Sequence, residues 1–192
     1  MNKNIEHYFF HKENFLDEKY CENSINELNE NTWEKHDWYG YGLTSTPAGD
    51  NEPEVYHSHS FSENIKEIND FIIQNLSLAI SEYVKSFNFD WFGGMLHGAD
   101  MKFLRYFPGQ TMLNHCDHIT IFSEDKRRGI PILSIIGILN DDYEGGELIM
   151  FEDKKIDTKK GDLLIFPSNF LFPHKITPVT KGVRYSYVSW MW

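Results

Sequence analysis

The hydrophobic pattern changes its period near residue 100. Over residues 15–28, apolar side chains recur every three or four positions, which predicts an amphipathic helix. The same spacing runs from Ile65 to Phe87, and Ser60-Phe-Ser-Glu63 just before it has the form of a capping box. The pattern therefore predicts two helices, the second being the longer. Irregular structure with one or two short strands is expected between them.

From about residue 100, apolar and polar residues alternate as they do in half-buried strands. Turn signals such as Pro108-Gly109, Gly145-Gly146 and Lys181-Gly182 separate the alternating segments. The predicted strands cover residues 101–107, 111–118, 130–139, 147–151, 162–166, 172–177 and 183–191. Many short strands with such turns are typical of a sandwich or a double-sheet jelly roll.

Length and charge narrow the class of protein. A chain of 192 residues, 41% of them hydrophobic, can bury one substantial core, so we expect a single domain over residues 1–192. Residues 1–98 would form a helical N-terminal elaboration and residues 99–192 the β-rich core. The formal net charge of -11 argues against binding to duplex nucleic acid, which requires a basic face.

Neither a membrane span nor a signal peptide is visible in the sequence, because no apolar run approaches the required length of about 20 residues. We therefore expect a soluble, cytoplasmic protein that does not bind membranes. In such a compartment Cys21 and Cys116 should be reduced thiols. The oligomeric state cannot be inferred from the sequence.

Candidate metal ligands lie in the segment Tyr106-Phe-Pro-Gly-Gln-Thr-Met-Leu-Asn-His-Cys-Asp117. On an extended strand His115 and Asp117 would point to the same face, whereas Cys116 would point away and pack elsewhere. Two imidazoles and one carboxylate with open positions opposite are the ligand set of non-haem Fe(II) oxygenases. His174 is the candidate for the second imidazole.

A competing metal motif precedes the second helix. His57-Ser-His59 followed by Glu63 has the His-x-His-x3-Glu order of cupin metal sites. Glu63 falls at the start of the predicted helix, however, and the glycines that frame the cupin motif are missing. The alternative interpretation, a polar pair in the loop before the helix, is favoured.

Arg184 begins the last predicted strand, where alternation places it on one face with Val188 and Trp190. If that face is the interior, the arginine has no acidic residue nearby in sequence. A buried guanidinium without a partner is costly, and an anionic ligand would satisfy it.

Taken in order, these residues resemble the Fe(II)- and 2-oxoglutarate-dependent dioxygenases, and within them the prolyl 4-hydroxylase-like branch. The resemblance covers about residues 100 to 192. Its ordered pieces are Tyr106-x-x-Gly109, His115-x-Asp117, Leu139-Asn-Asp141, Gly145-Gly-Glu-Leu148, Gly161-Asp-Leu-Leu-Ile-Phe166, His174, Arg184 and Trp190.

The resemblance implies a mainly β fold, a double-stranded β-helix or jelly roll, supported by flanking N-terminal helices. It implies that His115, Asp117 and His174 bind Fe(II), and that Arg184 binds the distal carboxylate of 2-oxoglutarate. The implied cofactors are Fe(II), 2-oxoglutarate as co-substrate and O2, with ascorbate as an accessory reductant. Tyr106 would line the co-substrate pocket, where its phenol either binds 2-oxoglutarate or serves as a core aromatic.

Two departures from the family pattern affect the co-substrate pocket. Relatives often have a tyrosine where this chain has Ile138, and many have one where it has Met112. The pocket should therefore be more apolar, with its polar contacts made by Arg184, Tyr106, and Ser134 or Ser186.

The charged segment 123–129 follows the strand that carries the ligands, and it would form either a lid over the substrate or a solvated hairpin turn.

The expected function is hydroxylation of an unactivated C–H bond, most simply of a peptidyl proline or similar residue. A peptide or protein substrate is favoured over a small molecule, although an oxygenase acting on a small molecule stays open. The alternative from another class is a cupin-like jelly-roll module that binds a metal or ligand without oxygenase activity. A halogenase-like variant is disfavoured, because such proteins replace the carboxylate that Asp117 supplies here.

Overall fold

The computed structural model is mainly β with two α-helices, which confirms the predicted fold class. It describes residues 4–39, 45–47, 51–87, 98–117 and 131–192. The helices are α1 (Glu18–Asn29) and α2 (Glu63–Lys85), with short 3-10 turns η1 (Ile5–Tyr8) and η2 (Ser58–Ser60). The strands before α2 are β1 (Phe10–Lys12), β2 (Glu34–Lys35), β3 (Asp37–Tyr39), β4 (Ser45–Pro47) and β5 (Glu54–Tyr56).

Each of the seven predicted C-terminal strands is present, and short strands are added between them. The predicted ones are β6 (Lys102–Tyr106), β7 (Met112–His115), β8 (Leu133–Ile138), β10 (Leu148–Met150), β12 (Leu163–Pro167), β13 (His174–Ile176) and β15 (Arg184–Met191). The additional ones are β9 (Glu144–Gly145), β11 (Lys154–Ile156) and β14 (Val179–Lys181). Strands of two or three residues are too short to show a period in the sequence.

Antiparallel pairing arranges most of these strands into two sheets. The larger has seven strands in the order β1-β12-β8-β15-β6-β5-β2, and the smaller has four in the order β11-β10-β13-β7. Strands β9 and β14 form one further pair, and β3 and β4 form another. Strands β1, β5 and β2 come from the N-terminal part, so residues 1–98 add strands to the large sheet as well as helices.

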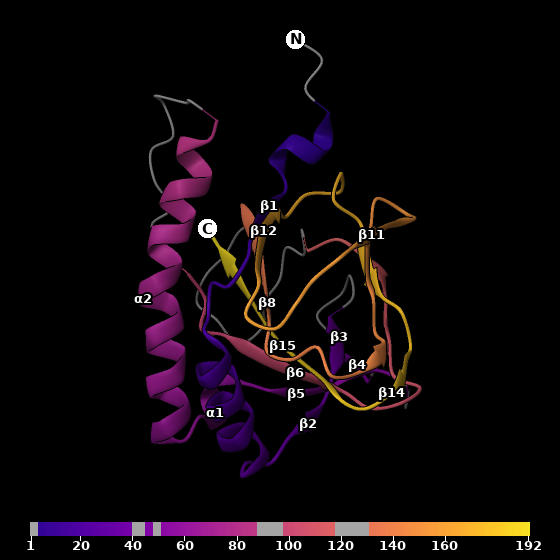
Figure 1. The fold of residues 1–192 in the computed structure, drawn as a ribbon. Coiled ribbons are helices and arrows are strands. Elements are labelled where there is room, and N and C mark those ends of the chain that lie inside the picture. The colour runs from indigo at the N-terminus through magenta and orange to yellow at the C-terminus, as the bar shows by residue number, and fades with distance from the viewer. Residues whose placement is uncertain (1–3, 40–44, 48–50, 88–97, 118–130) are drawn as a thin grey trace.

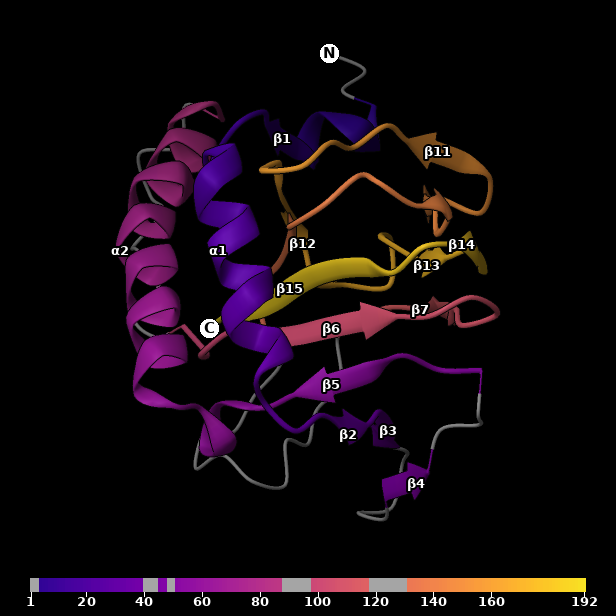
Figure 2. The same ribbon diagram turned by 60° about the horizontal axis from the view of Figure 1, so that its bottom comes forward.

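Both helices lie on one side of the strands, side by side, as Figures 1 and 2 show from two directions. Their apolar stripes and the facing side of the large sheet form one buried cluster, to which α1 contributes Leu28, α2 contributes Ile72, and the sheet contributes Phe103 and Tyr187. A second cluster fills the interior between the two sheets and includes Leu104, Ile136 and Ile176. The large sheet is therefore buried on both faces.

The long helix begins two residues later than the capping-box pattern predicts. Ser62 has the extended backbone of an N-cap, and its side chain accepts a hydrogen bond from the Ile65 amide at 3.4 Å. Ser60 instead ends the 3-10 turn η2. Glu63 is the first helical residue, where a negative charge is favoured by the helix dipole.

A β-bulge shapes the strand that carries the first candidate ligand. In the β13–β7 ladder His174 pairs with His115 and Ile176 pairs with Met112, so β7 advances three residues while β13 advances two. In a regular strand, residues 112 and 115 would point to opposite faces. The extra residue lets Met112 join the interior cluster while His115 faces His174.

Within the described parts of the chain, neither helix combines the length and apolar character needed to cross a bilayer.

Candidate metal and co-substrate site

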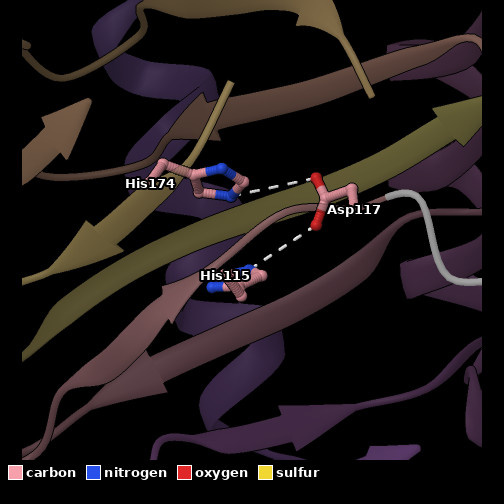
Figure 3. A group of neighbouring side chains, drawn as sticks. All are labelled: His115, Asp117 and His174. Carbon is pink, nitrogen blue, oxygen red and sulfur yellow. Dashed lines mark ion pairs between the residues drawn. The ribbon is translucent and has the colours of Figure 1, made fainter. Parts of the chain in front are cut away.

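Three side chains from two strands of the small sheet meet at the edge of the interior. His115 ends β7, His174 begins β13, and Asp117 follows β7 by two residues. The Asp117 carboxylate points one oxygen at each imidazole, as Figure 3 shows. The oxygen–Nε2 distances are 3.5 Å to His115 and 3.8 Å to His174.

These three residues form the one candidate metal-binding group found among the described residues, with their ligand atoms within 4.8 Å of one another. A first-row divalent ion binds imidazole nitrogen and carboxylate oxygen at about 2.0–2.2 Å, so two of its ligands lie at most about 4.4 Å apart. The side chains would need to close by less than about 1 Å. The geometry and the donor set both fit such an ion.

Backbone carbonyls orient both imidazoles. His115 Nδ1 lies 2.7 Å from the Leu113 carbonyl oxygen, and His174 Nδ1 lies 3.1 Å from that of Phe172. Each Nδ1 therefore donates its proton to a carbonyl oxygen, and Nε2, which faces Asp117, is the nitrogen that could bind a metal once it is deprotonated. In both cases the carbonyl belongs to the residue two positions earlier.

The electrostatics favour an ionised carboxylate. Burial alone would raise the pKa of Asp117, but the charges of His174 and His115 and hydrogen bonds from His115 and Ser134 hold it well below its usual range. Burial lowers the pKa of His174 to about 4, so this imidazole is neutral at pH 7. For His115 the hydrogen bond and charge of Asp117 outweigh burial and raise the pKa.

Asp117 lies beside His115, as predicted, but not because the two residues alternate on one strand. The strand ends at His115, and Asp117 lies in a bend, so the two side chains do not meet through regular strand alternation. Cys116, between them, lies outside the group: its Sγ is 3.7 Å from the Phe170 carbonyl oxygen. Both Cys116 and Cys21 are free thiols in the structure.

Arg184 is buried in the interior, with 1% of its surface exposed. It begins β15 opposite Tyr106 of β6, and its Cζ lies 5.1 Å from the centroid of the Tyr106 ring. Its Nη1 donates a 2.7 Å hydrogen bond to Ser186 Oγ, but its buried Nε has no hydrogen-bond partner among the described residues. A charged donor left in this state fits an anionic ligand such as a carboxylate.

Glycine makes room for Arg184. Gly146 has a φ of +60°, and a Cβ added there would lie 3.1 Å from Arg184 Cδ and 3.0 Å from Val179 Cγ2. A larger residue would press on the arginine stem. The Gly145-Gly146 pair, noted in the sequence as a turn signal, thus has a packing role beside Arg184.

The remaining pocket candidates have distinct surroundings. Tyr106 is 1% exposed, and burial raises its pKa to about 12. Ile138 and Met112 both belong to the apolar interior cluster. Ser186 accepts a hydrogen bond from Arg184, whereas the Ser134 hydroxyl lies 2.7 Å from that of Ser168.

Other sequence candidates lie apart from this site. His59 Nε2 lies 3.3 Å from Glu34 Oε1, and its ring stacks on His57 at 5.5 Å between centroids. Among the described residues, this pair and Glu63 form no metal-binding group. The segment 123–129, expected to be a lid or a hairpin turn, lies outside the described residues.

Comparison with known proteins places this geometry in a family. Residues 101–192 match the model of the 2OG-Fe(II) oxygenase superfamily. This part of the chain, just under half of its length, is similar to that superfamily. The match covers all five residues with a predicted role in holding iron or 2-oxoglutarate, Tyr106 included, and the expected cofactors Fe(II), 2-oxoglutarate and O2 agree with the family name and the donor set.

Curated relatives of this part of the chain include PKHD-type hydroxylases. That of Alteromonas mediterranea is 34% identical over 95 residues, which are 46% of this chain and 41% of the relative. That of Aliarcobacter butzleri is 33% identical over 96 residues, which are 47% of this chain and 41% of the relative. The matches thus span less than half the length of these relatives.

Solved structures with the same fold include prolyl hydroxylases. The viral collagen prolyl hydroxylase of Paramecium Bursaria Chlorella virus-1 has a TM-score of 0.61 at 18% identity, over 96% of this chain and 94% of its own. The prolyl hydroxylase of Trichoplax adhaerens, solved with a peptide fragment of the hypoxia inducible factor oxygen degradation domain, has a TM-score of 0.69 at 17% identity. That alignment covers 97% of this chain and 84% of the other. These likenesses confirm the jelly-roll fold.

Proposed function

We propose that this protein is an Fe(II)- and 2-oxoglutarate-dependent dioxygenase that hydroxylates a C–H bond. The observation that carries the proposal is that two groups of side chains, each lacking a ligand, lie in the space between the two sheets. One is the cluster of His115, Asp117 and His174, and the other is the buried guanidinium of Arg184. A metal ion would complete the first and a dicarboxylic acid the second.

The residues have separate tasks in this proposal. His115 and His174 hold the metal through Nε2, and Asp117 holds it through a carboxylate oxygen. Arg184 binds the distal carboxylate of 2-oxoglutarate, because its planar guanidinium can donate two parallel hydrogen bonds. Tyr106 and Ser186 keep Arg184 in place, the first by its ring and the second by its hydroxyl.

Bound iron supplies the redox chemistry, in which substrate, 2-oxoglutarate and O2 give hydroxylated substrate, succinate and CO2. The protein contributes geometry and a dry environment. Ile138, Leu104 and Ile136 belong to the apolar interior cluster, and excluding water matters because water would compete for the hydrogen bonds of Arg184.

A peptidyl proline or similar residue is the substrate class that we favour. Two observations support a peptide: the fold is shared with prolyl hydroxylases, one of them solved with a peptide, and apolar side chains are exposed beside the metal group. Phe170 and Leu171 are 71% and 49% exposed, on the segment that leads into His174. Leu113 on β7 is 61% exposed, two residues before His115. An apolar rim of this kind suits peptide side chains better than a small polar metabolite.

Succinate formation tests the proposal. Purified protein with Fe(II), ascorbate, O2 and 2-oxoglutarate should form succinate slowly without substrate, and His174→Ala should abolish this turnover. His59→Ala, which changes a histidine outside the group, should retain it. Metal binding without succinate formation would instead indicate a jelly-roll binding module.

Substrate class requires a second assay. Proline-containing peptides should gain 16 Da in the presence of the wild-type protein and 2-oxoglutarate, and should stimulate succinate formation. If small molecules stimulate turnover and peptides do not, the peptide proposal fails while the oxygenase proposal stands.

A further inference from the structure

The imidazole of His174 lies against a buried phenylalanine ring. Phe166 on β12 is 0% exposed, and its ring centroid is 5.2 Å from that of His174, with the two ring planes 73° apart. This is the edge-to-face arrangement that aromatic rings prefer. Strand β12 belongs to the large sheet and β13 to the small one, so the contact reaches a candidate metal ligand across the interior between the sheets.

The Phe166 ring also packs on Phe172, the residue that orients His174 through its backbone. The two phenylalanine rings are stacked, with their centroids 6.1 Å apart and their planes 22° apart. The Phe172 carbonyl oxygen lies 3.1 Å from His174 Nδ1. Phe166, Phe172 and His174 are therefore joined by three pairwise contacts. A change at position 166 would reach both the imidazole ring and the residue that holds its Nδ1.

The hydrogen bond and the ring contact restrain the imidazole in different ways. The torsion that turns a histidine ring about its Cβ–Cγ bond is broad, so the surroundings decide the plane of the ring. The hydrogen bond to Phe172 fixes the direction of Nδ1, but it still allows the ring to tilt about the line from Nδ1 to the carbonyl oxygen. A rigid ring against the imidazole limits this tilt, so that Nε2 stays directed at the Asp117 carboxylate, 3.8 Å away.

A large apolar residue at position 166 is also what packing alone would require. Alternation along β12 places Leu163 and Ile165 in the cluster under the helices, and Leu164 and Phe166 in the interior cluster. Leucine or methionine could fill such a position as well as phenylalanine does. What these side chains lack is a rigid, flat ring, so volume and ring shape can be tested separately.

We propose that Phe166 is a positioning residue that sets the plane of the His174 imidazole for metal binding. The inference rests on the proposed function, because it assigns His174 to a metal. A ligand that is already held in its bound orientation loses less conformational freedom when the metal binds, and the affinity is higher for that reason. Phe166 does not touch the metal and acts through His174.

The chain offers a matched control for the loss of a buried phenylalanine ring. Phe103 on β6 is also 0% exposed, and it belongs to the cluster under the helices. Its ring centroid lies 5.6 Å from that of Phe61 and 6.3 Å from that of Tyr187. Phe103→Leu thus removes a comparable ring from the opposite face of the large sheet.

The experiment is a Co(II) titration of the full chain in its metal-free form, followed by visible absorption. Phe166→Leu should weaken Co(II) binding about 10-fold and change the ligand-field bands, because the imidazole plane is no longer fixed. Phe166→Met, which fills the space with a flexible chain, should show the same loss. Phe103→Leu should bind Co(II) as the wild type does. Urea denaturation of the metal-free variants measures their free energy of unfolding separately.

The possible results separate the inference from the function on which it rests. Wild-type affinity and bands in both Phe166 variants would overturn the inference and leave the metal site standing. Wild-type binding by Phe166→Met alone would also overturn it, because side-chain volume would then be sufficient. Equal losses of affinity in Phe166→Leu and Phe103→Leu would trace the effect to stability and overturn it too. If the wild-type protein itself binds no Co(II), the metal site and the positioning role fail together.

Discussion

The two faces of the large sheet differ in composition although both are buried. On strand β15, Tyr185 and Tyr187 point to the side covered by α1 and α2, whereas Arg184 and Ser186 point into the space between the sheets. The helix-covered face is filled by apolar and aromatic side chains. The interior face carries the buried Arg184 guanidinium, whose Nε has no hydrogen-bond partner in the described part of the chain. Neighbouring residues of β15 therefore differ in role: one packs under the helices and the next faces the interior between the sheets.

The comparison indicates what each face contributes. Apolar burial under the helices stabilises the sheet without restricting what lies on its other side. The interior can then hold groups that oppose folding, such as the Arg184 guanidinium, which a bound anion would satisfy. Substitutions on the two faces should therefore affect different measurements, the free energy of unfolding on one and ligand binding on the other.

The largest effect is expected from Arg184→Met. Two charge-assisted hydrogen bonds to 2-oxoglutarate would be lost, worth roughly 1.5–3 kcal/mol each, so KM for 2-oxoglutarate should rise at least about 100-fold. The free energy of unfolding without ligand should stay equal or rise, because a buried charge is removed.

The matched control for this substitution is Arg105→Met. Arg105 lies on β6 on the opposite face, where its Nε donates a 2.6 Å hydrogen bond to Glu54. This variant should leave KM for 2-oxoglutarate near the wild-type value. An unchanged KM in Arg184→Met would show that Arg184 does not bind the co-substrate.

The reverse pattern is expected on the helix side. Ile72 of α2 is 0% exposed, and Ile72→Ala should lower the free energy of unfolding by about 2–5 kcal/mol, measured by urea denaturation. KM for 2-oxoglutarate should not change under conditions where the variant is folded. Ile73, its neighbour, is 37% exposed, and Ile73→Ala should cost less than about 1 kcal/mol. Similar losses in the two variants would contradict the assignment of faces.

The face of the large sheet to which a side chain points could be predicted from the sequence where a strand is long enough to show alternation of apolar and polar residues. Strand β15 spans eight residues, and alternation correctly separated Arg184 from Tyr185. Alternation could not predict the bulge in β7, because an extra residue changes the register without altering the local composition. His115 and Asp117 were paired correctly as neighbours, but through a regular strand that the structure does not contain.

The sequence also could not predict which distant segments of the chain contact one another. Ser134 was proposed from the sequence as a polar residue of the co-substrate pocket, but in the structure its hydroxyl lies 2.7 Å from that of Ser168. Nothing in the pattern of β8 indicates which residue of another strand faces position 134. Short strands were expected between the helices, where β2 and β5 lie, but β1 was not expected and the pairing of β5 with β6 and of β1 with β12 could not be predicted, because it depends on the tertiary fold.

The free energy of unfolding should also depend on pH, because His36 is a buried histidine. His36 is 7% exposed, and burial, followed by the charges of Lys102, His115 and His57, lowers its pKa to about 3. Its stabilising effect is complete above the unfolded-state pKa of about 6.5 and is lost as the pH falls toward 3, because the unfolded chain binds the proton first.

Between pH 7 and pH 5 this residue should lower the free energy of unfolding by roughly 2 kcal/mol. Urea denaturation at both pH values would measure the loss, and in His36→Gln the difference between them should shrink by that amount. An undiminished difference in the variant would mean that other groups cause the acid sensitivity.

The smallest effect on stability is expected at the start of α2, the longer of the two helices that cover the large sheet. Ser62→Ala removes the side chain that accepts from the Ile65 amide, and loss of such a cap costs about 1 kcal/mol. Ser60→Ala should change the free energy of unfolding by less than about 0.5 kcal/mol, because Ser60 lies in the preceding 3-10 turn. Urea denaturation of the two variants distinguishes the observed cap from the one that the sequence pattern predicts. A larger loss of stability in Ser60→Ala than in Ser62→Ala would show that Ser60 is the N-cap, as the capping-box pattern predicts. A larger loss in Ser62→Ala would show that α2 begins at Glu63. The Ile72 side chain then lies two and a half turns further along the buried face of the helix.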